Sequence, residues 1–372
     1  MNGFTADVIV IGGGIAGSSI AYRLACKGHL VILLEKGRVG EEASGRNSGG
    51  VRQQDRHWAE LPMAMEAIKL WADMKDELDC DVGYRRGGNI HYAHSPEKLE
   101  RLREVAERET KGGLAVEILS PEETRRVTPS LSEEIELYGS KYCPSDGTAN
   151  PLLVVKAICR AARGKGVQIH EHCPVVQLKA HKGRVAAAVT EKGAYEGAVF
   201  VNAAGPWTKG LCNTIGLDYP TTMEKRSLIV TEALPPMINQ FVESDKFYYR
   251  QALEGNIHVG GSITASPIEQ VDMAVEFKSF IEVGRWLPAF VPATRNVKLI
   301  RAFTGIREYT PDEIPVLDRA PGFGNFFVAS GFSGGFCLGP IVGKLMAEWI
   351  VDGKSSLDLS PFGWNRFETG NR

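Results

Sequence analysis

The chain has 372 residues, of which 43% are hydrophobic and 24% charged, so it is large enough for two globular domains with sizeable cores. Its formal net charge is −2, which leaves no excess of positive charge for binding nucleic acid or an anionic membrane. The sequence has no apolar run of membrane-spanning length, and its first predicted strand begins almost at the N-terminus. We therefore expect a cytoplasmic protein without a transmembrane segment or a secretory signal.

A glycine-rich segment at residues 12–17 follows an apolar run at residues 8–11. The run predicts a buried strand, the glycines a tight turn, residues 15–27 a helix, and residues 30–34 a second strand that ends at Glu35. This order of strand, turn, helix, strand and acid is the pattern of a dinucleotide-binding βαβ unit, and a purely structural glycine turn would not explain all of it. We predict a Rossmann-like α/β fold that binds an ADP-containing cofactor.

The glycines of this unit have distinct physical roles. Gly12 permits the turn, Gly14 lets the backbone approach a pyrophosphate, and Gly17 lets helix and strand pack closely. The N-terminus of the helix offers free N–H groups and a positive dipole end to the phosphates. Glu35 can accept hydrogen bonds from ribose hydroxyls.

The rest of the chain alternates helices and strands up to about residue 218. We expect helices at 58–78, 96–108, 122–126 and 152–163, strands at 89–94, 167–178, 184–189 and 198–202, and turns at 40–50 and 145–151. Between residues 219 and 300, aromatic residues, prolines and short alternating runs dominate, with strands at 247–250 and 257–261. This composition and alternation predict a separate domain with an antiparallel sheet. A final helix is expected at 338–351.

The seven cysteines are scattered along the chain, and none forms a CxxC pair. An iron–sulfur cluster, a structural zinc or a disulfide framework is therefore not expected. His170 and His172 flank Glu171, but the segment has the alternation of an ordinary strand. We predict no metal site.

No second glycine fingerprint follows the first, whereas chains that bind both a flavin and a nicotinamide nucleotide usually have two. The substrate itself is therefore the expected reductant of the cofactor. A nicotinamide-linked dehydrogenase is the alternative, and finding NAD(H) instead of FAD in the purified protein would support it.

Several further segments follow in order after the fingerprint. They lie at residues 44–50, 146–151, 202–207, 305–312 and 331–336. With the fingerprint, they resemble the FAD-dependent amine and amino-acid oxidase/dehydrogenase family that includes D-amino-acid oxidase, glycine oxidase and sarcosine oxidase. The resemblance covers nearly the whole chain and implies an FAD-binding domain at 1–82, 141–218 and 301–372, with a substrate domain at 83–140 and 219–300.

The resemblance implies where FAD binds. Residues 44–50 would wrap the diphosphate and the flavin edge, Val175 would bind the adenine through its main chain, and residues 203–207 would pass beneath the cofactor. Residues 331–336 and the N-terminus of the last helix would meet the flavin pyrimidine, where negative charge collects on reduction. The cofactor-binding residues implied in this way are Gly12, Gly14, Ile15, Ala16, Gly17, Glu35, Lys36, Ser44, Arg46, Asn47, Ser48, Gly49, Gly50, Val175, Ala203, Ala204, Gly205, Trp207, Gly331, Phe332, Ser333, Gly334, Gly335 and Phe336.

The sequence departs from sarcosine oxidases at two places. Gly305 stands where those sequences have the cysteine that attaches the flavin covalently, so FAD is expected to bind non-covalently. The lysine that follows Gly-His-Gly-Phe in that group is also absent, because this chain reads Gly-Gly-Phe-Cys at residues 334–337.

Four residues are implied to act on the substrate. Arg307 matches the arginine that binds the substrate carboxylate in glycine- and D-amino-acid-oxidase-like sequences, and a guanidinium suits this task. Arg52 is a second candidate, with a structural role as its alternative. Tyr248 or Tyr249, before Arg250, resembles the strand tyrosine near the substrate, although aromatic residues on strands also form cores. No catalytic base is nominated.

The resemblance implies hydride transfer from the carbon beside a neutral amine to flavin N5, which leaves an imine that water hydrolyses. The chain looks most like catalytic β subunits of dye-linked proline or hydroxyproline dehydrogenases and of opine oxidases. Partner chains with further flavin or iron–sulfur centres would then accompany it and could hold it at the inner membrane. The alternatives are a stand-alone oxidase of glycine, sarcosine or a D-amino acid, and a non-catalytic FAD-binding subunit of a complex.

Overall fold

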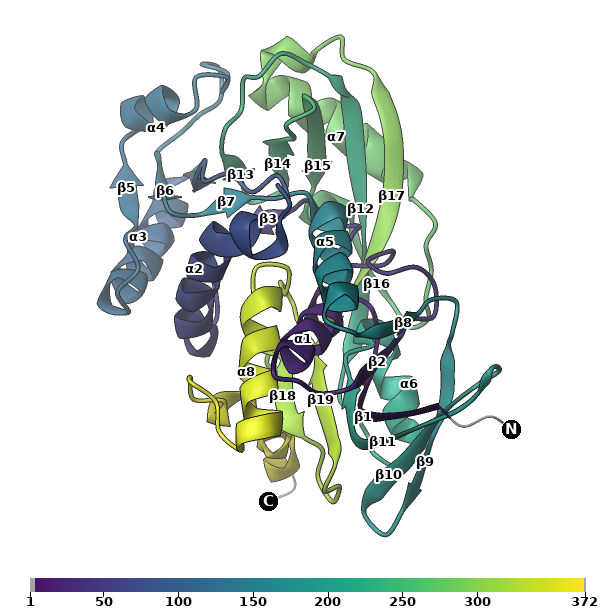
Figure 1. Cartoon of the computed structure of the whole chain (residues 1–372). Helices are drawn as coiled ribbons and strands as arrows, with labels where there is room; N and C mark the ends of the chain where they lie inside the picture. The colour runs from purple at the N-terminus through teal and green to yellow at the C-terminus, as the bar shows by residue number, and fades with distance from the viewer. Residues whose placement is uncertain (1–3, 371–372) are drawn as a thin grey trace.

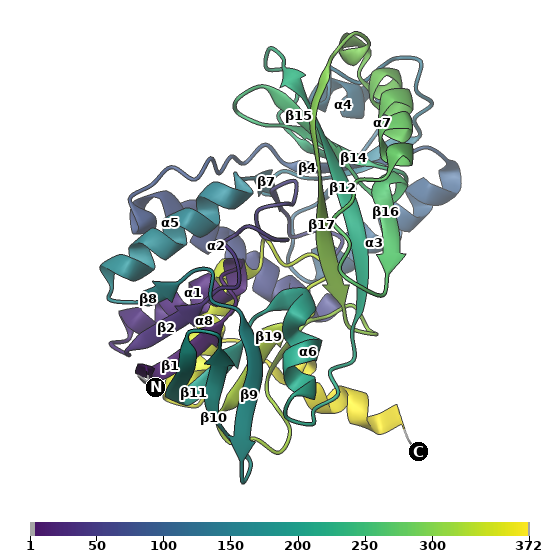
Figure 2. The ribbon, with the colours of Figure 1, turned by 90° about the vertical axis from the view of Figure 1, so that its right-hand side faces the viewer.

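The computed structural model describes residues 4–370, which form two large sheets with a cavity between them. Figure 1 shows the first sheet in the lower half of the view, with helices α1, α2, α5 and α8 beside it, and the second sheet in the upper half. Turned by 90°, the molecule shows the two sheets as separate layers joined by long connections (Figure 2). The α/β fold expected from the sequence, with a parallel-sheet domain and a mainly antiparallel one, is confirmed.

The first sheet has a parallel core in the order β19–β11–β1–β2–β8. These strands are β1 (Phe4–Ile11), β2 (Val31–Leu34), β8 (Gln168–His170), β11 (Gly193–Asn202) and β19 (Phe326–Ser330). The antiparallel strands β9 (Val175–His181), β10 (Arg184–Thr190) and β18 (Val316–Arg319) extend it. The single strand predicted at 167–178 is wrong, because His172 has a φ of 52°, which interrupts an extended chain between β8 and β9.

The alternation of side chains in β1 explains why both faces of this sheet are apolar. Val8 and Val10 pack with helices, whereas Ile9 and Ile11 pack with residues of β9, β10 and β11. The helices on the first face are α1 (Ile15–Cys26), α2 (Leu61–Leu78), α5 (Pro151–Gly164) and α8 (Gly339–Asp352), and α6 (Thr208–Asn213) packs against β9. Since α1 packs between α5 and α8, its start is fixed at the carboxyl end of β1.

The second sheet has the order β16–β12–β15–β14–β13–β4–β6–β5, and β17 pairs with the other edge of β12. Its strands are β4 (Asn89–Ala93), β5 (Glu117–Leu119), β6 (Gly139–Cys143), β12 (Thr222–Ala233), β13 (Phe241–Glu243), β14 (Tyr248–Gln251), β15 (Asn256–Gly260), β16 (Ala265–Ile268) and β17 (Leu299–Tyr309). Helices α3 (Pro96–Lys111) and α4 (Pro121–Val127) lie at its β5–β6 end. A small two-stranded sheet joins β3 (Gly50–Val51) to β7 (Gly147–Thr148).

Helix α7 (Phe277–Phe290) covers the second sheet and was not predicted from the sequence. Its buried side chains are Ser279, Val283, Leu287 and Phe290, which have helical spacing. The signal was hidden because Pro288 lies inside the helix and because Phe277 and Ile281 on its outer face are exposed hydrophobic residues.

Sheet membership differs from the predicted domain boundaries at two places. The boundary expected at residue 141 falls inside β6, which pairs with β4 and β5 of the second sheet. The boundary expected at residue 301 falls inside β17, which pairs with β12 along most of its length. The second sheet therefore includes residues 139–143 and 299–309. No helix within residues 4–370 is long and apolar enough to cross a membrane.

Candidate active site

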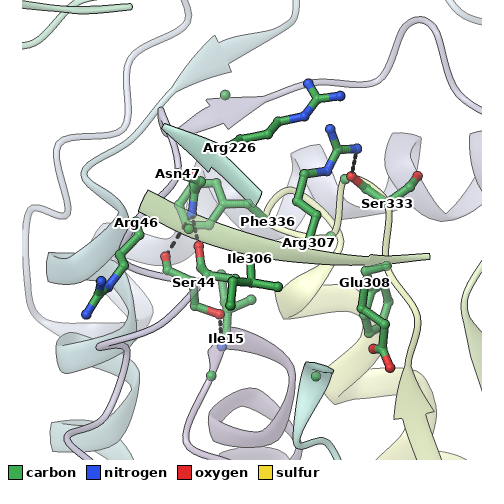
Figure 3. Close-up of a pocket in the computed structure, with 18 of the residues that line it drawn as sticks. Ile15, Ser44, Arg46, Asn47, Arg226, Ile306, Arg307, Glu308, Ser333 and Phe336 are labelled. Atoms are coloured by element: carbon green, nitrogen blue, oxygen red, sulfur yellow. Dashed lines mark hydrogen bonds between the residues drawn. The ribbon is translucent and has the colours of Figure 1, made fainter. Parts of the chain in front are cut away.

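A cavity of about 320 Å³ lies between the two sheets. Its lining comes from the glycine turn and the start of α1, from residues 43–56, from the turn at 203–206, from strands β12, β13, β14 and β17, and from residues 329–336. Figure 3 shows Ile15 and Ser44 on one side of this cavity and Arg226 and Arg307 on another. Segments far apart in the sequence thus meet around one space.

The glycine turn has the geometry that its sequence pattern requires. Gly12 has a φ of 105°, and a Cβ atom on it would lie 2.4 Å from the carbonyl oxygen of Ala203. A Cβ atom on Gly17 would lie 2.0 Å from the carbonyl oxygen of Gly12 and 3.2 Å from the Cβ of Ala203. Gly14 is the N-cap of α1 and lines the cavity. Only glycine, which has no Cβ atom, therefore fits at positions 12 and 17.

The loop that follows β2 closes over the turn. Ser44 accepts a hydrogen bond from the amide of Ile15 at 2.9 Å, at the first residue of α1. The Asn47 side chain donates to the carbonyls of Ala43 and Ser44 at 3.0 and 2.8 Å and accepts from the amide of Gly49 at 2.7 Å. Asn47 therefore shapes the loop that brings Ser44, Arg46 and Ser48 to the cavity wall.

The acid at the end of β2 is held by the backbone around it. Glu35 is buried and accepts hydrogen bonds from the amides of Gly13 at 2.6 Å and Gly37 at 2.8 Å. Lys36 forms an ion pair with Glu42 at 2.5 Å, and its ammonium group lies 3.9 Å from the centre of the Trp207 ring. These residues lie beside the glycine turn but do not line the cavity.

The segment before α8 forms the opposite wall. Gly331 has a φ of 84°, and Phe332, Ser333, Gly334, Gly335 and Phe336 line the cavity. The Trp71 indole of α2 donates to the carbonyl of Cys337 at 2.8 Å and so anchors this segment.

Glu308 on β17 joins this segment to the second sheet. Its Oε2 atom accepts hydrogen bonds from the Ser330 hydroxyl at 2.7 Å and from the Gly331 amide at 2.9 Å. Burial raises the pKa of Glu308 to about 7, and the hydrogen bonds from Ser330 and Gly331 oppose this rise.

Five arginines line the cavity, and four of them have carboxylate partners. Arg46 faces Glu42 at 4.0 Å, Arg52 faces Glu243 at 3.6 Å, Arg56 faces Glu60 at 3.7 Å, and Arg226 pairs with Glu224.

The fifth, Arg307, has no ion-pair partner within the described residues and donates to the carbonyl of Ser333. Burial lowers the pKa of Arg307, and the nearby charge of Arg226 lowers it further. The charge of Glu224, on the paired strand, acts in the opposite direction and raises this pKa. Arg307 is thus the arginine of this cavity that has no carboxylate within ion-pair distance among residues 4–370.

The two candidate tyrosines lie on opposite faces of β14. Tyr248 lines the cavity, directly opposite Glu243 on β13 and Gly260 on β15. Tyr249 points into the core of the second sheet, is 1% exposed and stacks on Phe247 with ring centres 5.6 Å apart. The expectation that Tyr249 contacts substrate is wrong for this reason: successive side chains of a strand point to opposite faces.

The cavity contains most of the predicted site residues. Those that line it are Gly14, Ile15, Ala16, Ser44, Arg46, Asn47, Ser48, Gly50, Arg52, Ala203, Gly205, Tyr248, Arg307, Phe332, Ser333, Gly334, Gly335 and Phe336. Those that lie outside its lining are Gly12, Gly17, Glu35, Lys36, Gly49, Val175, Ala204, Trp207, Tyr249 and Gly331. Val175 begins β9 and packs partly buried against the core of the first sheet.

Sequence reasoning missed Arg56, Arg226, Glu243 and Glu308. Glu308 lies inside the segment 305–312 that carries the family resemblance, so its position was a usable signal. Arg226 follows Glu224 by two positions on β12, so their side chains share one face of the strand, and this alternation is readable in the sequence. Glu243 had no such signal, because β13 has only three residues.

The walls of the cavity fit a bound flavin dinucleotide. The first N–H groups of a helix have no acceptor within the helix, and Gly14, Ile15 and Ala16 at the start of α1 line the cavity. Residues 332–336, which precede α8, line the same cavity.

The comparison with known proteins agrees with this geometry. Residues 7–349 match the family model of the FAD dependent oxidoreductases, known as DAO. The chain belongs to this family. The membership expected from the sequence motifs is thereby confirmed.

Three similar proteins show how far the likeness extends. The L-proline dehydrogenase from P. horikoshii is 27% identical with a TM-score of 0.93, and 99% of each chain is covered. The glycine oxidase from Geobacillus kaustophilus is 25% identical with a TM-score of 0.91, covering 97% of this chain and 98% of that one. The mitochondrial pyruvate dehydrogenase phosphatase regulatory subunit from Mus musculus is 30% identical over 96% of this chain, which spans 43% of that protein's length.

Proposed function

We propose that this chain uses FAD to oxidise the carbon–nitrogen bond of an amino acid or of a secondary amine that carries a carboxylate. The observation that carries this proposal is Arg307, a partly buried guanidinium that lines the cavity without a carboxylate partner within the described residues. A buried charge is costly unless it is paired, so an anionic ligand is stabilised at this place. A substrate carboxylate supplies that charge, and the guanidinium can bind it through two hydrogen bonds.

The chemistry divides between the cofactor and the chain. Bound FAD would accept a hydride from the substrate carbon next to nitrogen, while the N–H proton is lost and the bond becomes a C=N double bond that water hydrolyses. The chain contributes by holding the substrate in one orientation, with Arg307 and Tyr248 on the side of the second sheet. The amides of residues 332–336 and the N-terminus of α8 would stabilise negative charge on the reduced cofactor.

The residues proposed to hold FAD are Gly14, Ile15, Ala16, Ser44 and the segments 46–50, 203–205 and 332–336, with Glu35, Lys36, Val175 and Trp207 toward the adenosine end. Non-covalent binding is part of this proposal, because Gly305 has no side chain to form a bond with the flavin. Acid precipitation of the purified protein tests it: yellow colour left in the supernatant supports non-covalent binding, whereas a yellow pellet contradicts it.

Proline, hydroxyproline or an opine is the proposed substrate class. The name of the L-proline dehydrogenase, which is similar to this chain over 99% of its length, supports proline. An electron acceptor other than oxygen, and partner chains with further redox centres, belong to the same proposal. A stand-alone oxidase is the alternative, and the glycine oxidase from Geobacillus kaustophilus supports it. Peroxide formation by the isolated chain would favour the oxidase.

The test is anaerobic mixing of the purified protein with a panel of amines while the flavin absorption is followed. The panel contains L- and D-proline, hydroxyprolines, sarcosine, glycine, D-alanine and several opines. Bleaching by one member supports direct oxidation.

Arg307→Ala should retain flavin and lose at least about 100-fold in kcat/KM, as expected for a lost charge-assisted contact. Arg301→Ala, on an exposed position of the same strand, is the matched control and should change little.

A non-catalytic FAD-binding subunit is the second candidate function. It is favoured by the 30% identity to a protein named as a regulatory subunit of a phosphatase. Flavin that stays oxidised with every amine, in a protein that keeps its full flavin content, would support this candidate over the enzyme.

A further inference from the structure

The cavity has an acidic end as well as a basic one, and the acidic end lies on the second sheet. Lys141 on β6, His91 on β4, Glu243 on β13 and Tyr248 on β14 follow one another directly across the strands. Side chains at directly paired positions point to the same face of a sheet. Of these four, Glu243 and Tyr248 line the cavity, whereas Lys141 is fully buried behind it.

Glu243 is held by one of its two carboxylate oxygens. Oε1 accepts a hydrogen bond from the Asn89 side chain at 3.0 Å and lies 3.6 Å from Nε of Arg52. No residue within 4–370 donates to Oε2, and this atom is not among the fully buried unpaired ones. The carboxylate is therefore fixed in place while one oxygen stays available to the cavity.

Buried charges of both signs lie behind Glu243. Asp55 lies 2.7 Å from Lys141 and 3.8 Å from Arg52, and Glu109 also lies 2.7 Å from Lys141. Three carboxylates, namely Asp55, Glu109 and Glu243, thus share the two cations Lys141 and Arg52. Burial alone would lower the pKa of Arg52, but the charges of Glu243 and Asp55 raise it.

Further acids lie nearby: Glu60 pairs with Arg56, and buried Asp146 accepts hydrogen bonds from the backbone amide and side chain of Gln53 at 2.8 and 3.0 Å.

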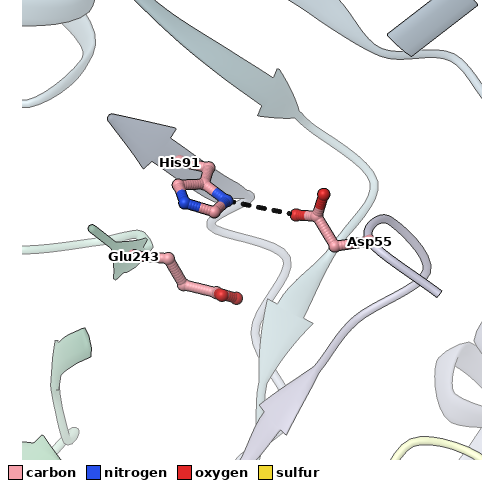
Figure 4. Close-up of side chains that lie close together, drawn as sticks. All are labelled: Asp55, His91 and Glu243. Atoms are coloured by element: carbon pink, nitrogen blue, oxygen red, sulfur yellow. Dashed lines mark hydrogen bonds and ion pairs between the residues drawn. The ribbon is translucent and has the colours of Figure 1, made fainter. Parts of the chain in front are cut away.

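These contacts do not favour a bound metal ion. Asp55, His91 and Glu243 come close enough to share an ion, and Figure 4 shows His91 pointing to Asp55 with Glu243 beside them. However, the guanidinium of Arg52 lies within 4 Å of both carboxylates, and the Lys141 ammonium already binds Asp55. Both oxygens of Asp55 are thus already engaged, Oδ1 by the Lys141 ammonium at 2.7 Å and Oδ2 by His91 at 3.4 Å, so Asp55 is not free to ligate an ion.

We propose that Glu243 is a specificity-determining residue, which binds the protonated amine of the substrate through Oε2 while Arg307 binds the carboxylate. This inference rests on the proposed function. The two ends lie on β13 and β17 of one sheet, and Tyr248 lies between them, its ring folded over Gly260, where a Cβ atom would meet the hydroxyl at 2.7 Å. The cavity thus offers a carboxylate oxygen of Glu243 and the guanidinium of Arg307 to a ligand that carries both charges.

The experiment compares ligands that differ only in the amine. L-proline and cyclopentanecarboxylate form one pair, and glycine and acetate form the other. Binding to the anaerobic, flavin-loaded protein is measured from the perturbation or bleaching of the flavin spectrum. Glu243→Gln keeps the size of the side chain and its contact with Asn89 but removes the charge. This substitution should weaken binding of the amine-bearing ligand about 10- to 100-fold. Binding of the ligand that has only a carboxylate should stay unchanged or become tighter.

Two further variants make the outcomes distinct. Glu117→Gln on exposed β5 removes one negative charge from the same sheet outside the cavity and should change neither ligand. Glu243→Asp keeps the charge but shortens the side chain by one methylene group. Its affinity for the amine-bearing ligand should therefore lie between those of the unmodified protein and of Glu243→Gln. Equal effects of Glu243→Gln on both ligands of a pair, or no effect on either, overturn the role of Glu243.

The result for Arg307→Ala separates this inference from the proposed function, because that variant should weaken both members of a pair. Weaker binding of both ligands in Arg307→Ala, together with no selective loss of the amine-bearing ligand in Glu243→Gln, would refute only the role of Glu243. If the unmodified protein binds neither L-proline nor glycine while it binds their carboxylate counterparts, the acidic end is not an amine site. If it binds none of the four, the role of Glu243 toward these amino acids is overturned, and bleaching with the wider amine panel decides the proposed function separately.

Discussion

The two walls of the cavity use different physics. The wall from the first sheet acts through backbone: glycines without side chains, the start of α1 and a hydroxyl at Ser44. The wall from the second sheet acts through charged side chains, among them Arg226, Arg307 and Glu243. The first kind of wall depends on the close approach of backbone segments, such as Gly12 to Ala203, whereas the second depends on strand register. A substitution should therefore act by steric exclusion on the first wall and by uncompensated charge on the second.

The largest expected effect is steric and concerns the glycine turn. Gly12→Ala places a methyl group 2.4 Å from the carbonyl of Ala203 at a φ of 105°, so the turn must move. We expect a loss of bound flavin and of more than about 3 kcal/mol in the free energy of unfolding. Gly28→Ala is the control, since Gly28 also has a positive φ of 88° but nothing lies within 4 Å of its added Cβ. It should cost about 1–2 kcal/mol and keep the flavin. Similar flavin contents in both variants would contradict the steric explanation.

The next effect concerns the buried charges behind the second wall. Lys141→Met removes the fully buried ammonium that lies 2.7 Å from both Asp55 and Glu109, and leaves the two carboxylates without it. Removing one partner of a buried ion pair costs about 3–5 kcal/mol, which chemical denaturation measures. Lys69→Met, in the exposed pair with Glu66 at 2.5 Å, should stay within about 1 kcal/mol. Equal losses of unfolding free energy in both variants would show that the buried ion pairs of Lys141 stabilise the fold no more than an exposed pair does.

Glu308 connects the two walls and should show in the pH dependence of stability. Burial raises the pKa of Glu308 to about 7, above its value of 4.5 in an unfolded chain. Between these values the unfolded chain has released a proton that the folded protein keeps, so stability falls as the pH rises through this window. Glu308→Gln removes this titration and should gain up to about 3 kcal/mol relative to the unmodified protein between pH 4 and pH 8. Parallel stability profiles of the two proteins would refute the raised pKa.

The smallest effect should separate the two adjacent tyrosines. Tyr248→Phe removes a hydroxyl that faces the cavity, so we expect a raised KM and little change in the free energy of unfolding. Tyr249→Phe alters a side chain that is 1% exposed in the core, so activity should stay within twofold and stability within about 1–2 kcal/mol. An activity loss confined to Tyr249→Phe would reverse the assignment of the two faces of β14.

The second sheet shows where prediction from sequence was incomplete. The strands around Tyr248 were expected, but which of two adjacent tyrosines faces the cavity depends on the side of the sheet that packs on α7, and that helix was not predicted. Arg307 was found through the family motif, whereas the ion pair of Arg226 with Glu224 and the absence of a carboxylate within ion-pair distance of Arg307 among residues 4–370 required the structure. The charge balance of a cavity is a sum over all its walls, so no single segment contains it.

The sequence by itself determined the βαβ unit, its glycine turn and the acid at its end, because each of these depends on residues within about one βαβ unit of one another. Tertiary structure alone decided the acidic end of the cavity. Glu243 meets Asn89 across 154 positions of sequence, and Lys141 meets Asp55 across 86. Contacts of this range are set by strand order and register in the sheet. Strand β13 has only three residues, which are too few to predict its neighbouring strands or its register from the sequence.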